Sequence, residues 1–231
     1  MGDPGVPNGL NGPDSAGARV LLVVPTSWEW YFEPDKKNSI TWYAERALRM
    51  ADRISPGQGI DVYLYGQPKK GGDGTEVIRT SLDRASLREW TGDWATRPNA
   101  KQGLFADAVP ASKVEKRLGA AGSPWYSLPL PAVRTVCKES APRGEATLVL
   151  FWLDRMTQAD DIVRCIAKEG GPAVFWQFFG DPGDINYTFW TKDALHRGGV
   201  LPQLRFHMGL RWRWRAFLRD FTRWSQAEKL R

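Results

Sequence analysis

The stretch from Ala146 to Asp181 constrains the fold more than any other part of the chain. It opens with a continuous apolar run over 146–153 that is rich in valine, leucine and aromatic residues. Such a run is typical of a strand covered on both faces of a sheet. A helical pattern follows, and a second apolar run covers 173–179. Strand, helix and strand joined by short links predict a βαβ unit with two parallel strands.

The helical pattern between the two runs has a defined apolar face and a defined end. Ile162, Val163, Ile166 and Ala167 recur at the spacing of one helical face, and Gly170 with Gly171 predicts the helix stop. Each apolar run is followed by an aspartate, Asp154 in the first case and one residue after Gly180 in the second. Because open parallel sheets bind ligands at the carboxyl ends of their strands, these acids predict where a site lies.

Similar patterns over the rest of the chain predict a doubly wound α/β sheet. The expected strands are 19–25, 60–65, 76–82, 146–153, 173–179 and 200–208. The expected helices are 40–54, 128–140, 160–169, 188–199 and 209–231, with two short helices inside 83–122 that bury Trp90 and Trp94. A short turn makes the third strand antiparallel to the second, and Pro202 indicates that the last strand is an edge. We therefore predict six mostly parallel strands, one antiparallel edge strand and helices on both faces.

Charge is distributed unevenly along the 231 residues. The net charge is +6, yet 196–231 alone has nine lysines and arginines against two acids, so an electrostatic partner is expected at the C-terminus. The predicted organisation is a disordered tail at 1–18, an α/β domain at 19–208 and a basic amphipathic helix at 209–231. No signal-peptide pattern or membrane-spanning run is present, which predicts a soluble, cytoplasmic protein.

The residue types that serve most enzymes give little indication of catalysis. Cys137 and Cys165 each fall on the apolar side of an expected helix, which is typical of buried structural cysteines in a reducing compartment. His196 and His207 have no partner spacing, and no glycine-rich phosphate loop follows any strand. The chain is therefore predicted not to be an enzyme. The alternative is a metal-dependent hydrolase or nuclease that uses Asp154, Glu29 and Asp181.

Four segments resemble von Willebrand factor A domains, which are built on this type of vWA/Rossmann-like sheet. They are LLVVPTSWEW, GSPWYSLPLPAVRTV, LVLFWLDRMTQADD and PAVFWQFFGD, and they span roughly 19–208. The last segment is especially similar to the bacterial TerF-like branch. The resemblance implies a non-enzymatic protein-interaction module of a bacterial stress-response or conflict-type system.

The same resemblance implies a metal-ion-dependent adhesion site, in which an Asp-x-Ser-x-Ser motif, a loop threonine and a strand aspartate hold a divalent cation. The matching positions are Pro25, Ser27 and Glu29 for the motif, Ser123 or Pro124 for the threonine, and Asp154 for the aspartate. Pro25 offers no side-chain oxygen, so the site is predicted to be degenerate and without a cofactor. The alternative is a Mg²⁺ or Mn²⁺ ion held by Ser27, Glu29, Ser123 and Asp154.

Aromatic residues are expected to surround this edge of the sheet. The predicted partner-binding residues there are Trp28, Trp30, Tyr31, Trp125 and Asp181. Tryptophan and tyrosine supply much of the binding energy at protein interfaces, which favours a protein partner. The aromatic segment 26–32 can equally pack down over the edge, and Asp181 can be a simple turn residue.

The C-terminal pattern has two stripes. The basic one contains Arg211, Arg215, Arg219 and Arg223, and the apolar one contains Trp214, Phe217, Leu218, Phe221 and Trp224. One interpretation is that the apolar stripe packs on the sheet and the arginines face solvent. The alternatives are that the helix binds an acidic protein, nucleic acid or an anionic membrane surface.

Overall fold

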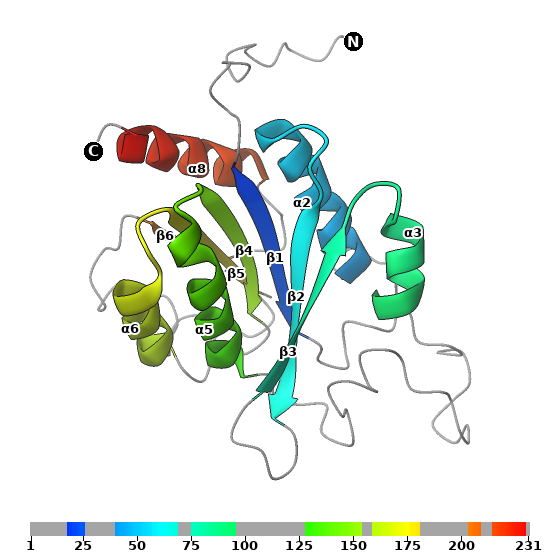
Figure 1. The fold of residues 1–231 in the computed structure, drawn as a ribbon, viewed down its shortest axis with the longest axis horizontal. Helices are drawn as coiled ribbons and strands as arrows, with labels where there is room; N and C mark the ends of the chain where they lie inside the picture. Colours follow the sequence, from blue (N-terminus) through cyan, green and yellow to red (C-terminus); the bar gives the residue numbers. More distant parts are fainter. Residues whose placement is uncertain are drawn as a thin grey trace.

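The structure is a computed structural model. It describes residues 18–25, 40–68, 75–95, 128–153, 159–180, 203–208 and 214–229. The strands are β1 Arg19–Pro25, β2 Ile60–Pro68, β3 Thr75–Leu82, β4 Thr147–Leu153, β5 Val174–Gly180 and β6 Leu204–Met208. The helices are α2 Ile40–Ile54, α3 Leu87–Trp90, α5 Pro129–Ser140, α6 Ala159–Glu169 and α8 Trp214–Lys229 (Figure 1). A π-helical turn, Thr91–Ala95, continues α3, and a 3-10 turn, Ala141–Arg143, continues α5.

The six strands form one sheet in the order β3-β2-β1-β4-β5-β6. All neighbouring strands are parallel except β2 and β3, which are antiparallel. The fold class predicted from the sequence is therefore confirmed, including the antiparallel edge strand and the edge position of β6. The expected helix at 188–199 and nearly all of the expected tail at 1–18 lie outside the described residues.

Helices cover both faces of the sheet and bury two apolar cores (Figure 1). Successive side chains of a strand point to opposite faces, so β1 supplies both cores. Val20, Leu22 and Val24 pack with α2 and α8, whereas Leu21 and Val23 pack with α5 and α6. This double burial explains why the central strands are apolar at nearly every position.

The apolar stripe of α8 packs on the sheet, as one interpretation of the sequence predicted. Phe217, Leu218, Phe221 and Trp224 are all buried. The ring of Phe175 on β5 lies 6.0 Å from that of Phe221 and 5.4 Å from that of Trp224, centroid to centroid. The position of the Trp214 side chain is outside the described part of the chain.

Two details differ from the expectation. Ala167 is exposed, while Cys165 is buried beside Ile162 and Ile166. The face of α6 that meets α5 is centred on 162, 165 and 166, and Ala167 lies too far around the helix to reach it. In addition, the described part of the last strand begins at Leu204, later than the predicted start at 200. Trp90 is buried and Trp94 packs against the core, as predicted.

We predict that Phe221→Ala lowers the free energy of unfolding by about 3–5 kcal/mol, because it leaves a cavity between α8 and β5. Chemical denaturation measures the change. Gln226→Ala on the exposed side of the same helix is the control and should shift stability by less than about 0.5 kcal/mol. Equal effects of the two substitutions would contradict the packing of α8.

Candidate functional site

The strand order places a topological switch point between β1 and β4. From β1 the chain continues through α2 to β2 on one side, and from β4 it continues through α6 to β5 on the other. Because β1 and β4 are parallel, both end at the same edge, which we call the carboxyl edge. In open α/β sheets, ligands bind in the crevice outside the carboxyl ends of the strands at such a switch point. The geometry therefore selects the carboxyl edge beside β1 and β4 as the candidate site.

The residues predicted for this site lie outside the described part of the chain. They are Ser27, Trp28, Glu29, Trp30, Tyr31, Ser123, Trp125, Asp154 and Asp181. Arg211 of the predicted basic stripe lies outside it as well. In the sequence, Asp154 directly follows the last residue of β4, and Ser27 and Glu29 follow the end of β1 within four residues. Asp181 follows β5, which is one strand away from the switch point. The strand order thus ranks Asp154 above Asp181 as a site residue.

Beneath the carboxyl edge, aromatic side chains fix the strand ends on both faces of the sheet. On the α5 face, the hydroxyl of buried Tyr65 donates a 2.7 Å hydrogen bond to the backbone carbonyl of Trp152. This bond ties the end of β2 to the end of β4 across β1. On the other face, the ring of Tyr43 lies 4.3 Å from that of Trp152 and 5.2 Å from that of Phe179. These contacts therefore hold the ends of β2, β4 and β5 together beneath the carboxyl edge.

The role of Tyr65 was not predicted from the sequence. The sequence did contain a sign of this role, because a tyrosine in an apolar strand needs a hydrogen-bond partner once its ring is buried. The sequence could not indicate which backbone group would be that partner.

The residue at the position of the leading aspartate in the implied cation site cannot bind a metal ion. Pro25 is the buried last residue of β1, paired in register with Tyr65, and it has no side-chain oxygen to offer. Within the described ranges, no group of three or more histidines, cysteines or acids is placed to hold a metal ion. The absence of a bound cation from this protein stays a prediction.

A network of charged side chains joins α5 to the first three strands. Asp61 accepts from Arg79 at 3.1 Å and also pairs with Arg19. Glu139 of α5 accepts from Arg79 at 3.2 Å and from the Tyr63 hydroxyl at 2.7 Å. Burial raises the pKa of Tyr63 above its ordinary value, and the neighbouring carboxylate of Glu139 raises it further. This arrangement stabilises the α5 face of the sheet, because each charge in it has a partner.

The two cysteines contact each other where α5 meets α6. Both are buried, and both are free thiols. Burial is the main cause that raises the pKa of each thiol, with Cys165 adding to the effect on Cys137 and Glu169 adding to the effect on Cys165. Protonated thiols are poor nucleophiles, so this pair is suited to packing rather than to covalent catalysis.

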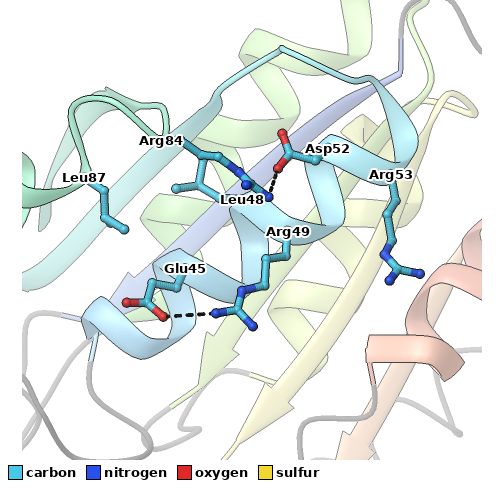
Figure 2. A pocket seen from close by; sticks show the side chains of 7 residues that line it. All are labelled: Glu45, Leu48, Arg49, Asp52, Arg53, Arg84 and Leu87. Atoms are coloured by element: carbon cyan, nitrogen blue, oxygen red, sulfur yellow. Dashed lines mark ion pairs between the residues drawn. The ribbon is translucent and has the colours of Figure 1, made fainter. Parts of the chain in front are cut away.

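An open groove of about 640 Å³ lies between α2 and the segment that enters α3 (Figure 2). Leu48 and Leu87 line it together with charged side chains. Two ion pairs occupy it, Arg49 with Glu45 at 3.7 Å and Arg84 with Asp52. Figure 2 shows Arg53 extending away from both pairs. The groove holds paired charges without an adjacent nucleophile among its lining residues, which does not indicate a catalytic centre.

The three described arginines of the basic stripe lie on the exposed side of α8. Arg215, Arg219 and Arg223 are all exposed, and they alternate with the buried aromatic residues of the same helix. Arg219 approaches Asp220 to 3.5 Å. A second set of arginines, Arg46, Arg49 and Arg53 on α2, was not predicted from the sequence, because the apolar face of that helix is its stronger pattern.

Comparisons with known proteins leave the family open. No family model matches the chain, and no curated protein matches it. Among solved structures, it is similar to one described as von Willebrand factor type A from Catenulispora acidiphila, with 11% identity and a TM-score of 0.36. The match covers 90% of this chain and 41% of that one. At this level the likeness carries no argument about function, and the family resemblance stays a prediction. Separately, none of the described helices is long and apolar enough to cross a membrane.

We predict that Tyr63→Phe changes how stability depends on pH. The raised pKa means that Tyr63 stabilises the folded protein below its ordinary pKa of about 10, and that this contribution decreases as the pH rises above that value. The substitution should therefore cost about 1 kcal/mol at neutral pH, by loss of the bond to Glu139. The difference from the unsubstituted protein should shrink above about pH 10, measured by urea unfolding. A difference that stays constant across this range would contradict the raised pKa.

Proposed function

We propose that this protein is a non-enzymatic interaction module that binds a protein partner at the carboxyl edge, beside β1 and β4. The observation that carries the proposal is the switch point between these two strands, above a floor of fixed aromatic side chains. By the sequence resemblance alone, we place the module among von Willebrand factor A domains of the TerF-like branch. The same resemblance suggests a bacterial stress-response or conflict-type system as its setting.

The residues that follow the two strands support a protein partner. Trp28, Trp30 and Tyr31 follow β1 in the sequence, and such residues dominate the binding energy of protein interfaces. Asp154 follows β4 and adds one carboxylate. The contacts that hold the strand ends together support binding, because less conformational freedom is lost when a partner docks beside ordered strand ends.

We further propose that partner binding does not depend on a cation. In the family pattern, the leading aspartate brings charge directly to the metal. Here the buried Pro25 takes that position at the end of β1. Divalent cations such as Mg²⁺ need several oxygen ligands in good geometry, so the loss of one carboxylate weakens the site considerably.

The partner is tested by affinity capture from the native host, followed by binding measurements with the identified protein in purified form. We expect Trp28→Ala combined with Trp30→Ala to weaken binding by about a hundredfold, or about 2.8 kcal/mol, as for interface anchor residues. Lys168→Ala, at an exposed position on the α5 and α6 side, is the matched control and should leave binding unchanged. Equal binding by both variants would place the interface elsewhere.

The cation is tested by thermal unfolding with Mg²⁺ or Mn²⁺ against a chelator. A bound ion at about 100 times its dissociation constant adds roughly 2.7 kcal/mol of stability, whereas we expect no shift in melting temperature. A rise that disappears in Asp154→Ala would contradict the proposal. It would also favour the alternative of a metal-dependent hydrolase that uses Asp154, Glu29 and Asp181.

A further inference from the structure

The helix pairs on the two faces of the sheet differ in charge. Within their bounds, α2 and α8 together have seven basic and four acidic residues, a net charge of +3. By the same count, α5 and α6 have four of each and no net charge. Six of the seven basic residues are arginines: Arg46, Arg49, Arg53, Arg215, Arg219 and Arg223. Among these four described helices, the excess of positive charge therefore belongs to the pair on one face of the sheet.

Five of these arginines are exposed on the sides of α2 and α8 that face away from the sheet, and Arg46 is half-buried. On α8, Arg215, Arg219 and Arg223 lie opposite the buried aromatic residues and are exposed. On α2, Arg49 and Arg53 are exposed, opposite the buried residues Ala44, Ala47 and Ala51. Because the cores fix which side of each helix is buried, they also fix the outward direction of both rows.

The N-terminal parts of α2 and α8 contact the same side chain of β5, and the two helices run in the same direction. The ring of Phe179 on β5 contacts Tyr43 of α2 at 5.2 Å and Phe217 of α8 at 6.4 Å, centroid to centroid. From there α2 runs back toward the start of β2, and α8 runs from Phe179 toward Phe175. Both helices thus cross the sheet against the strand direction. The outward surface of α2 and α8, bearing the six arginines, forms one basic face.

Like charges on this basic face are close enough to interact. Burial lowers the pKa of Arg46, and the positive charge of nearby Arg49 lowers it further. The Arg46 guanidinium also stacks on the half-buried ring of Trp42, with its central carbon 4.0 Å from the ring centroid. An anion bound among these side chains relieves their mutual repulsion.

We propose that this basic face docks an acidic segment of a protein partner. Arginine is the residue best suited to such binding, because its guanidinium pairs with carboxylates through two parallel hydrogen bonds. Glu45, Asp52 and Asp220 are interspersed among the arginines, and they repel phosphates that are held at the fixed spacing of a nucleic-acid duplex. A polypeptide segment can instead place its carboxylates between these acids. The face is separate from the carboxyl edge, so the two proposals succeed or fail independently.

Fluorescence anisotropy with a labelled oligoglutamate peptide at low ionic strength tests the basic face, and a duplex DNA of mixed sequence serves as the second probe. The α8 variant replaces Arg215, Arg219 and Arg223 by glutamine, and the α2 variant replaces Arg49 and Arg53 by glutamine. The control variant replaces Arg134, Lys138 and Lys168, which are exposed on the opposite face, and removes the same charge as the α8 variant. Melting temperatures confirm that each variant is folded.

We expect the α8 variant to bind oligoglutamate about tenfold more weakly or worse, and the α2 variant several-fold more weakly. The control variant should stay within about twofold of the unsubstituted protein, which supports a specific face. An equal loss in the control variant would overturn the proposal, because binding would then follow net charge alone. Tighter binding of DNA, lost in the same α8 and α2 variants, would overturn it in favour of nucleic acid. Absence of oligoglutamate binding would also overturn it.

Discussion

The rest of the structure depends on the burial of β1 and β4 on both faces. These two neighbouring strands are almost entirely inaccessible to solvent, from Val20 to Val24 and from Leu148 to Trp152. Backbone groups at the centre of the sheet are paired by the neighbouring strands, so the side chains can be apolar throughout. Polar and charged side chains are consequently excluded from the interiors of β1 and β4. Any chemistry of recognition must then occur at the strand ends or on the outward sides of the helices.

This exclusion explains where the charged groups of the described residues occur. The Asp61, Arg79 and Glu139 network lies toward the β3 edge of the sheet, where β3 has a neighbouring strand on one side alone. The arginines of α2 and α8 lie on the other face of the sheet, on the sides of these helices that point away from the core. At the carboxyl edge, the two central strands end with Pro25 and Leu153, and the residues that directly follow them in the sequence, Thr26 and Asp154, are polar. The same burial therefore sets the position of both proposed binding surfaces.

The central strands could be predicted because a strand buried on both faces appears in the sequence as a continuous apolar run. The helices could be predicted because a helix buried on one side has apolar residues at the helical spacing. The prediction was weakest where contacts join distant residues. The bond from Tyr65 to the carbonyl of Trp152 spans 87 positions, and no local pattern indicates it. Ala167 was wrongly predicted to lie on the buried face of α6. It is apolar and fits the helical spacing, but its position on the helix points away from α5. The site itself was predicted only as an edge, since the strand order that locates the switch point is a property of the whole sheet.

The α8 helix shows why a core element and a binding element need not be alternatives. The sequence presented its two stripes as competing interpretations, one of packing and one of binding. In the structure, the aromatic stripe is in the core, and this packing holds the helix in one orientation on β5. A fixed orientation removes the entropy cost that a mobile helix would incur on binding, which makes an outward row of arginines more effective rather than less. The stripe that stabilises the fold is therefore the reason that the basic stripe is presented as an ordered surface.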